Sequence, residues 1–144
     1  RRKRFYFWML NLNMNFRDQL PRKRINQTTI KLTNFDSPLL KKPITFEVFS
    51  TKGNLKSRGD YDGECFKFYD ELPCVGAIWY RRGYFEAMVH ECIHLAHHVL
   101  ALKLIRVPWT MKEDYPNMST EEKICQLSGA ISSAIYYEHF LKYP

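Results

Sequence analysis

Hydrophobic and polar positions alternate along the first half of the chain with the period of two that is typical of β-strands. The clearest case is ITFEVFST, residues 44–51, where Ile44, Phe46 and Val48 fall on one side. The same kind of pattern predicts further strands, and polar, turn-rich stretches separate them. These further strands are expected over residues 4–16, 28–35, 65–70 and 75–80.

The period then becomes helical. From about Tyr84 to Leu104, apolar residues recur every three or four positions, and a second helical pattern runs from Ser119 to about Leu141. The stretch between them contains two prolines and tolerates no long helix. Strands followed by two long helices predict an α+β fold, with a small mixed or antiparallel sheet packed on the two C-terminal helices. We expect one domain over residues 1–144.

Charge is unevenly distributed. Residues 1–60 carry 14 Lys/Arg against 4 Asp/Glu, whereas residues 61–144 carry 8 against 11, and the whole chain has a net charge of +7. The basic clusters RRKR and PRKR lie within residues 1–24. Such a field attracts nucleic acid, an anionic membrane or an acidic protein, although a solvated, solubilising surface is the simpler explanation.

No apolar run is long enough to cross a bilayer, so no membrane contact is expected. The first residues also lack the pattern of a signal peptide. The four cysteines form no CxxC pair, which argues against a structural zinc knuckle. Buried thiols in a reducing compartment are the simpler interpretation, and they favour a cytoplasmic protein.

The segment HECIH, His90 to His94, is an H-E-x-x-H match within the predicted helix. Residues four apart lie on the same helix face, so the two imidazoles can meet one Zn²⁺ ion. Glu91 follows the first histidine and is placed beside the metal, where a carboxylate can take a proton from a water that the metal activates. The alternative is a helix whose histidines are simply hydrogen-bonded.

A catalytic zinc needs a third protein ligand. His97 and His98 are too close on the same helix and are expected to surround the site without coordinating. The following helix opens with STEEKICQLSG, which offers Glu121 and Glu122. Ser119 and Glu122 also form an S-x-x-E capping box, in which Glu122 would bond to the Ser119 backbone and leave Glu121 as the available carboxylate.

The segment from about residue 75 to 135 resembles the zincin metallopeptidases. In their gluzincin branch, HExxH is followed by a glutamate on the next helix, and EEKIC is similar to that second motif. Small phage-encoded metallopeptidases are similar too, with an acidic pair that opens the second helix. The metzincin branch is excluded because His97 and Leu100 stand where it needs Gly and His.

The resemblance implies one Zn²⁺ held by His90, His94 and Glu122, with Glu91 as the catalytic base. It also implies that an edge strand before the helix binds the substrate, a peptide or protein, and the residues in that position are Ala77, Ile78, Trp79 and Tyr80. If the protein is phage-encoded, the compartment would be the cytoplasm of the host cell.

The sequence therefore predicts a zinc metallopeptidase. One alternative is a non-catalytic protein on a zincin-like scaffold that binds or inhibits a host target. The other is a basic nucleic-acid-binding module that uses the first half of the chain.

Overall fold

The computed structural model describes residues 25–53, 62–69 and 73–144. The strand predicted over residues 4–16 and the two basic clusters within residues 1–24 lie outside this part of the chain. Binding of nucleic acid or of an acidic protein through those clusters therefore stays a prediction.

Four strands form one mixed sheet: β1 (Asn26–Leu32), β2 (Ile44–Thr51), β3 (Gly63–Lys67) and β4 (Cys74–Arg81). Their order is β1-β2-β4-β3. The β1–β2 and β3–β4 pairs are antiparallel, whereas β2 and β4 are parallel. Each described strand corresponds to a predicted one, and β2 has the predicted bounds.

The alternation in β2 predicted one buried face, but all eight of its residues are buried. The reason is its place in the middle of the sheet. Ile44, Phe46 and Val48 pack on the helices, while Phe49 joins a second apolar cluster on the other face with Trp79 of β4. The polar side chain of Glu47 is buried there because Thr29 donates to its carboxylate at 2.8 Å.

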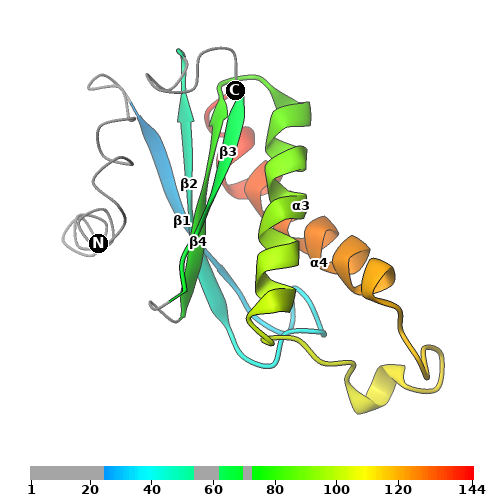
Figure 1. Ribbon diagram of the computed structural model, residues 1–144. Helices are drawn as coiled ribbons and strands as arrows, with labels where there is room; N and C mark the ends of the chain where they lie inside the picture. Colours follow the sequence, from blue (N-terminus) through cyan, green and yellow to red (C-terminus); the bar gives the residue numbers. More distant parts are fainter. Residues whose placement is uncertain (1–24, 54–61, 70–72) are drawn as a thin grey trace.

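Two long helices cover one face of the sheet: α3 (Phe85–Ala101) and α4 (Thr120–Ile135), the latter extended by the π-helical turn η2 (Tyr136–Phe140) (Figure 1). The short 3₁₀ helix η1 (Trp109–Met111) lies between them. This arrangement confirms the predicted α+β class. In the described part of the chain, none of the helices has both the length and the apolar character needed to cross a membrane.

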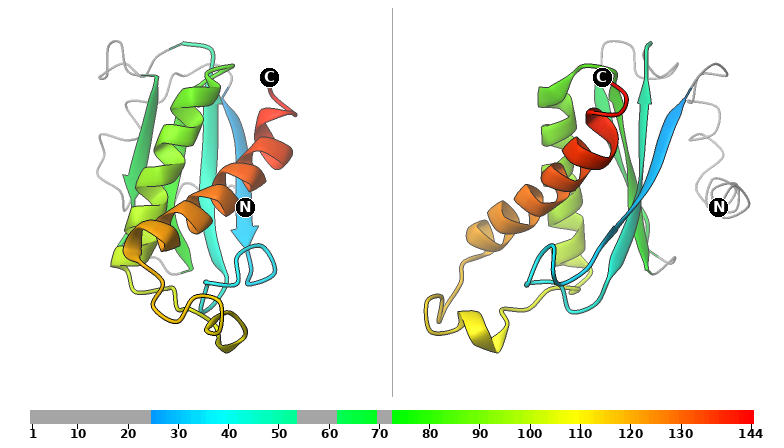
Figure 2. Two further views of the ribbon diagram at one scale, coloured as in Figure 1. Left: turned by 90° about the vertical axis from the view of Figure 1, so that its right-hand side faces the viewer. Right: turned by 180° about the vertical axis from the view of Figure 1, so that it is seen from behind.

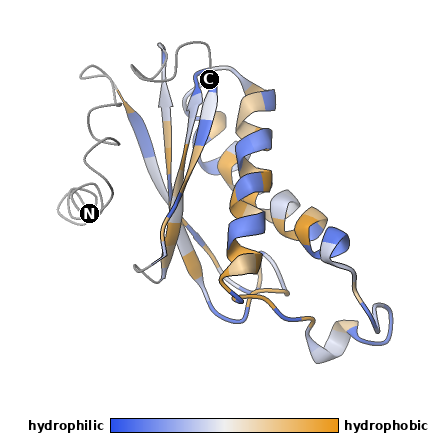
Figure 3. Cartoon of the chain, in the orientation of Figure 1, coloured by the Kyte–Doolittle hydropathy of each residue, from blue (hydrophilic) through white to orange (hydrophobic). Residues whose placement is uncertain are grey.

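Sequence periodicity explains which side of each helix is buried. Hydrophobic and hydrophilic bands alternate along α3 (Figure 3), and the apolar side of that helix packs on the sheet through Met88, Cys92, Leu95 and Val99. In α4 the buried residues are Ile124, Leu127, Ile131 and Ile135. Ser119 caps this helix as predicted, because its hydroxyl accepts from Glu122 N at 3.1 Å.

Helix α3 ends in a Schellman motif. Leu104 N donates to Val99 O at 3.4 Å, and Lys103 N donates to Leu100 O at 3.0 Å. Lys103 therefore has φ 58°, the left-handed conformation that glycine adopts at much lower cost. It is the only non-glycine residue with a positive φ in the described part of the chain. The helix end is thus less stable with lysine than it would be with glycine.

A buried histidine connects the C-terminal turn to the sheet. The ring of His139 in η2 is fully buried, with Nδ1 2.6 Å from Thr28 Oγ1 and Nε2 2.9 Å from Ser50 Oγ. Both hydroxyls can donate or accept, so a neutral imidazole satisfies both contacts. Burial, and secondarily the charge of Lys142, lowers the pKa of His139 to about 4.

This shift predicts a loss of stability in acid. An unfolded histidine has a pKa of about 6.5, so the unfolded chain binds more protons than the folded chain between that pH and pH 4. His139 contributes about 3 kcal/mol to the free energy of unfolding above about pH 6.5. This contribution is lost as the pH falls to about 4. Urea unfolding of the parent and of His139→Gln at both pH values measures it. Equal pH dependence in the two proteins would contradict the assignment.

Candidate metal centre

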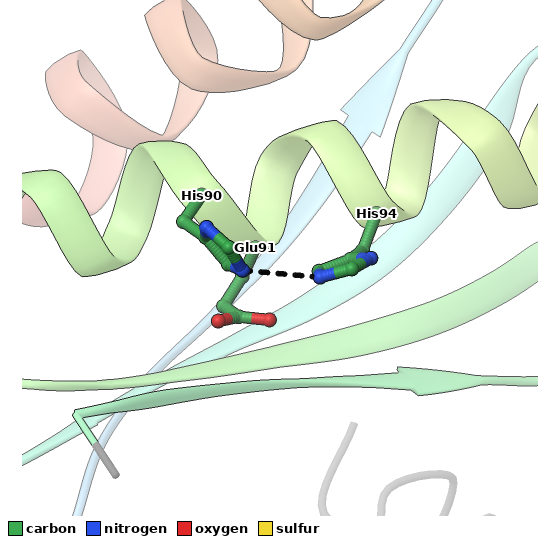
Figure 4. Close-up of side chains that lie close together, drawn as sticks. All are labelled: His90, Glu91 and His94. Carbon is green, nitrogen blue, oxygen red and sulfur yellow. Dashed lines mark hydrogen bonds between the residues drawn. The ribbon is translucent and has the colours of Figure 1, made fainter.

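Three polar side chains gather on the side of α3 that faces β3. The imidazoles of His90 and His94 and the carboxylate of Glu91 point toward that strand, while α4 passes on the other side of α3 (Figure 4). Their ligand atoms all lie within 4.8 Å of one another. Within the described part of the chain, this is the only group of three or more such residues that could hold a metal ion.

The two histidines have the separation that a shared metal requires. Their Nε2 atoms are 3.1 Å apart, and their ring centroids are 4.9 Å apart. Two nitrogens that each lie about 2.0–2.1 Å from one tetrahedral zinc ion are about 3.4 Å apart. The pair therefore fits a zinc ion with little movement. The same distance also fits a hydrogen bond between two neutral imidazoles, one donating and one accepting.

Glu91 lies beneath the pair and against the backbone of β3. Its side chain is only 7% exposed. A Cβ atom on Gly63 would come within 2.9 Å of Glu91 Cγ and Oε2, so the absence of a side chain at Gly63 makes room for the carboxylate. Burial, and secondarily the charge of Glu64, raises the pKa of Glu91 to about 7. A carboxyl group of this kind can both accept and return a proton near neutral pH.

Strand β3 forms the facing wall of the site. Four residues of the strand line a hollow of about 410 Å³ together with the three residues of α3, and they are Gly63, Glu64, Cys65 and Lys67. A second hollow of about 690 Å³ adjoins it at Gly63 and reaches the start of α3. Sequence periodicity predicts a strand here but gives no indication that the strand faces the histidines. The only local signal is a glycine at the position where the strand begins.

The charges around the hollow also affect His94 and Cys65. The pKa of His94 is lowered first by burial and then by the neighbouring charges of His90 and Lys67. Burial, followed by the charge of Glu91, raises the pKa of Cys65 to about 12, so its thiol stays protonated at neutral pH.

The other two histidines of the helix differ from each other. His97 is exposed and is not part of the metal-binding group. His98 is buried, its Nε2 donates to Phe68 O at 2.8 Å, and its ring makes an edge-on contact with Tyr69 at 4.8 Å. His98 therefore ties the far end of β3 to α3, which agrees with a supporting role.

The structure does not bring the two acidic residues of α4 to the histidines. Neither Glu121 nor Glu122 belongs to the described group of possible metal ligands. Glu122 Oε1 instead accepts from Gln126 Nε2 at 3.1 Å, one turn further along α4. The resemblance predicts Glu122 as the third ligand, but the described geometry does not place it beside the histidines.

The predicted substrate strand must be corrected. Residues Ala77 to Tyr80 belong to β4, which pairs with β2 on one side and with β3 on the other. Backbone groups that are already paired on both sides cannot accept an added peptide strand. In the part of the sheet that the structure describes, β3 is the edge strand next to the site, and β1 is the other edge.

No family model, no curated protein and no solved structure matches this chain. The metal centre is therefore inferred from the spacing of HECIH together with the geometry of the three side chains.

A first prediction concerns the histidine pair. His90→Ala and His94→Ala should each remove most of the zinc bound per chain, because each deletes one of the two facing nitrogens. Removing a residue that only hydrogen-bonds to a zinc ligand lowers the zinc affinity about 10–100-fold, so removing a ligand itself should lower it further. Elemental analysis of the purified proteins measures this.

His97→Ala is the matched control, since it removes an exposed imidazole from the same helix without touching the pair. Full zinc occupancy in the His90 and His94 variants, or equal loss in all three, would contradict the metal centre.

Proposed function

We propose that the protein is a zinc-dependent hydrolase that cleaves peptide bonds. The observation that supports this most directly is the pair of Nε2 atoms 3.1 Å apart, with the carboxylate of Glu91 in the same group and an open hollow beside it. A bound zinc ion would supply a Lewis acid for a carbonyl oxygen and would lower the pKa of water.

The chain's own residues would then divide the remaining work. His90 and His94 hold the ion. Glu91 accepts a proton from the attacking water and passes it to the leaving amine, a task that requires a carboxylate close to the ion and held in place. The contact of Glu91 with Gly63 and its burial restrict the motion of that carboxylate.

An extended peptide would lie along β3. Every second residue of an edge strand directs its N–H and C=O groups outward, where another strand can pair with them. A peptide added there would run beside the hollow lined by Gly63, Cys65 and Lys67. This placement replaces β4 as the strand that would bind the substrate.

A third zinc ligand is proposed because the resemblance includes one and because a catalytic zinc ion requires it. A catalytic zinc ion has three protein ligands and an open position, and Glu91 cannot serve as base if it is one of them. Glu122 is the candidate. The imidazoles face β3 and α4 lies on the other side of α3 (Figure 4), so coordination by Glu122 would require the first turn of α4 to move around α3 toward the histidines.

A cytoplasmic location is also proposed. The four cysteines all lie in the described part of the chain, and none of them forms a disulfide. This is the state expected in a reducing compartment.

Glu91→Gln tests the catalytic role. Glutamine keeps the shape of the side chain but cannot accept a proton, so the variant should fold, retain zinc and lose about 10²–10⁴ in rate. The assay is cleavage of a peptide library, measured beside zinc content. If zinc and activity are both retained, the enzyme proposal fails and a non-catalytic binding protein on the same scaffold replaces it. If zinc is lost, Glu91 is itself a ligand.

Glu122→Gln and Glu121→Gln test the third ligand. If Glu122 coordinates zinc, its substitution should weaken zinc affinity at least tenfold more than that of its neighbour. Both variants leave the Ser119 cap in place, so helix stability is matched. Equal zinc affinities measured by competition with a chelator would restrict the site to the residues of α3 and β3.

A further inference from the structure

Two loops that are distant in the sequence form one surface at the end of the domain where α3 ends. They are residues 33–43 and residues 103–112, here called the loop pair. An antiparallel bridge joins Leu40 to Ile105, and backbone hydrogen bonds of 2.9 and 2.7 Å flank it. Both loops lie toward this end in the two views of Figure 2. The bridge holds the side chains of one loop in a fixed relation to those of the other.

Each loop presents an aromatic side chain to solvent. Phe35 is 97% exposed and Trp109 is 85% exposed. Phe35 stands in a well-ordered turn, in which Thr33 N donates to Asp36 Oδ2 at 2.8 Å and Phe35 N donates to Thr33 Oγ1 at 3.2 Å. Single exposed apolar residues are common, so the exposure of these two indicates a binding site only together with the residues around them.

Their surroundings are basic. The loop pair contains five cations and one acid, and that acid, Asp36, already accepts hydrogen bonds from Thr33. None of the five cations forms an ion pair with another described residue, and all are exposed. Glu113 and Asp114 follow directly, and Glu138 lies close enough to Asp36 for their charges to interact, so the positive charges outnumber the negative ones by one. The five cations are Lys41, Lys42, Lys103, Arg106 and Lys112.

Lys103 provides an independent observation. It occupies the left-handed position at the end of α3, where glycine would be more stable. A residue held in a costly conformation points to a function that compensates for the cost. Compared with glycine, lysine adds a positive charge on a four-carbon stem at this exposed position of the loop pair.

We propose that the loop pair binds single-stranded nucleic acid. Phosphates would lie along the five cations, and unstacked bases would stack on the exposed rings of Trp109 and Phe35. A lipid surface fits less well, because it favours an amphipathic helix or a continuous apolar patch, and the two aromatic residues stand on separate loops. This site shares no residue with the metal centre or with the basic clusters within residues 1–24.

The experiment uses the full chain and a fluorescently labelled single-stranded oligothymidylate, with binding followed by anisotropy at several salt concentrations. Trp109→Ala should weaken binding about 5- to 100-fold, the range for loss of one stacked base. Tyr137→Ala is the matched control, because it removes another exposed ring, 69% exposed, outside the loop pair. That control should bind as the parent does.

Lys103→Gly separates binding from stability. The melting temperature should rise by about 2–4 °C, because glycine relieves the left-handed strain. Affinity should nevertheless fall, and the slope of log affinity against log salt should shrink by about 0.7, the value for one lost phosphate contact on a single strand. Lys31→Gln, an exposed charge outside the loop pair, should leave the slope unchanged.

Three results would overturn the proposal. The first is parental affinity in both Trp109→Ala and Lys103→Gly. The second is binding to anionic phospholipid vesicles with no binding to the oligonucleotide. The third is binding that disappears only when the basic residues of 1–4 and 21–24 are replaced by glutamine.

Discussion

The contact between helix α3 and the edge strand β3 is the constraint on which the candidate metal centre depends. At one end the carboxylate of Glu91 rests on Gly63, and at the other His98 donates to the backbone of Phe68. Between these two points β3 runs beside the histidine pair and forms the wall of the hollow. If either end of the strand moved away from α3, Glu91 would be exposed to water and would lose its fixed position under the histidines.

Features that depend on neighbours in the sequence could be predicted. The period of two predicted the bounds of β2, and the helical period predicted where α3 and α4 lie along the chain. Helical spacing alone also brings His90 and His94 together, since residues four apart share a face. The cap at Ser119 follows from the same local chemistry.

Features that depend on distant segments could not be predicted. Nothing local in VGAIWY shows that two strands flank it, and the prediction of an edge strand there is wrong because β4 lies inside the sheet. The burial of both faces of β2 has the same cause. The position of Glu122 depends on how α4 packs across α3, which the spacing of EEKIC does not determine.

The strand order has a consequence for how the chain folds. β1–β2 and β3–β4 are each antiparallel and local, whereas the parallel β2–β4 pair joins them across a longer separation. Each hairpin can form early, but their union has to bring together segments that are distant along the chain, which slows folding. The residues that line the hollow beside the histidines all belong to β3 and α3. The hollow is therefore built from segments that are close in the sequence, whereas the parallel pairing with β2 covers the other edge of β4.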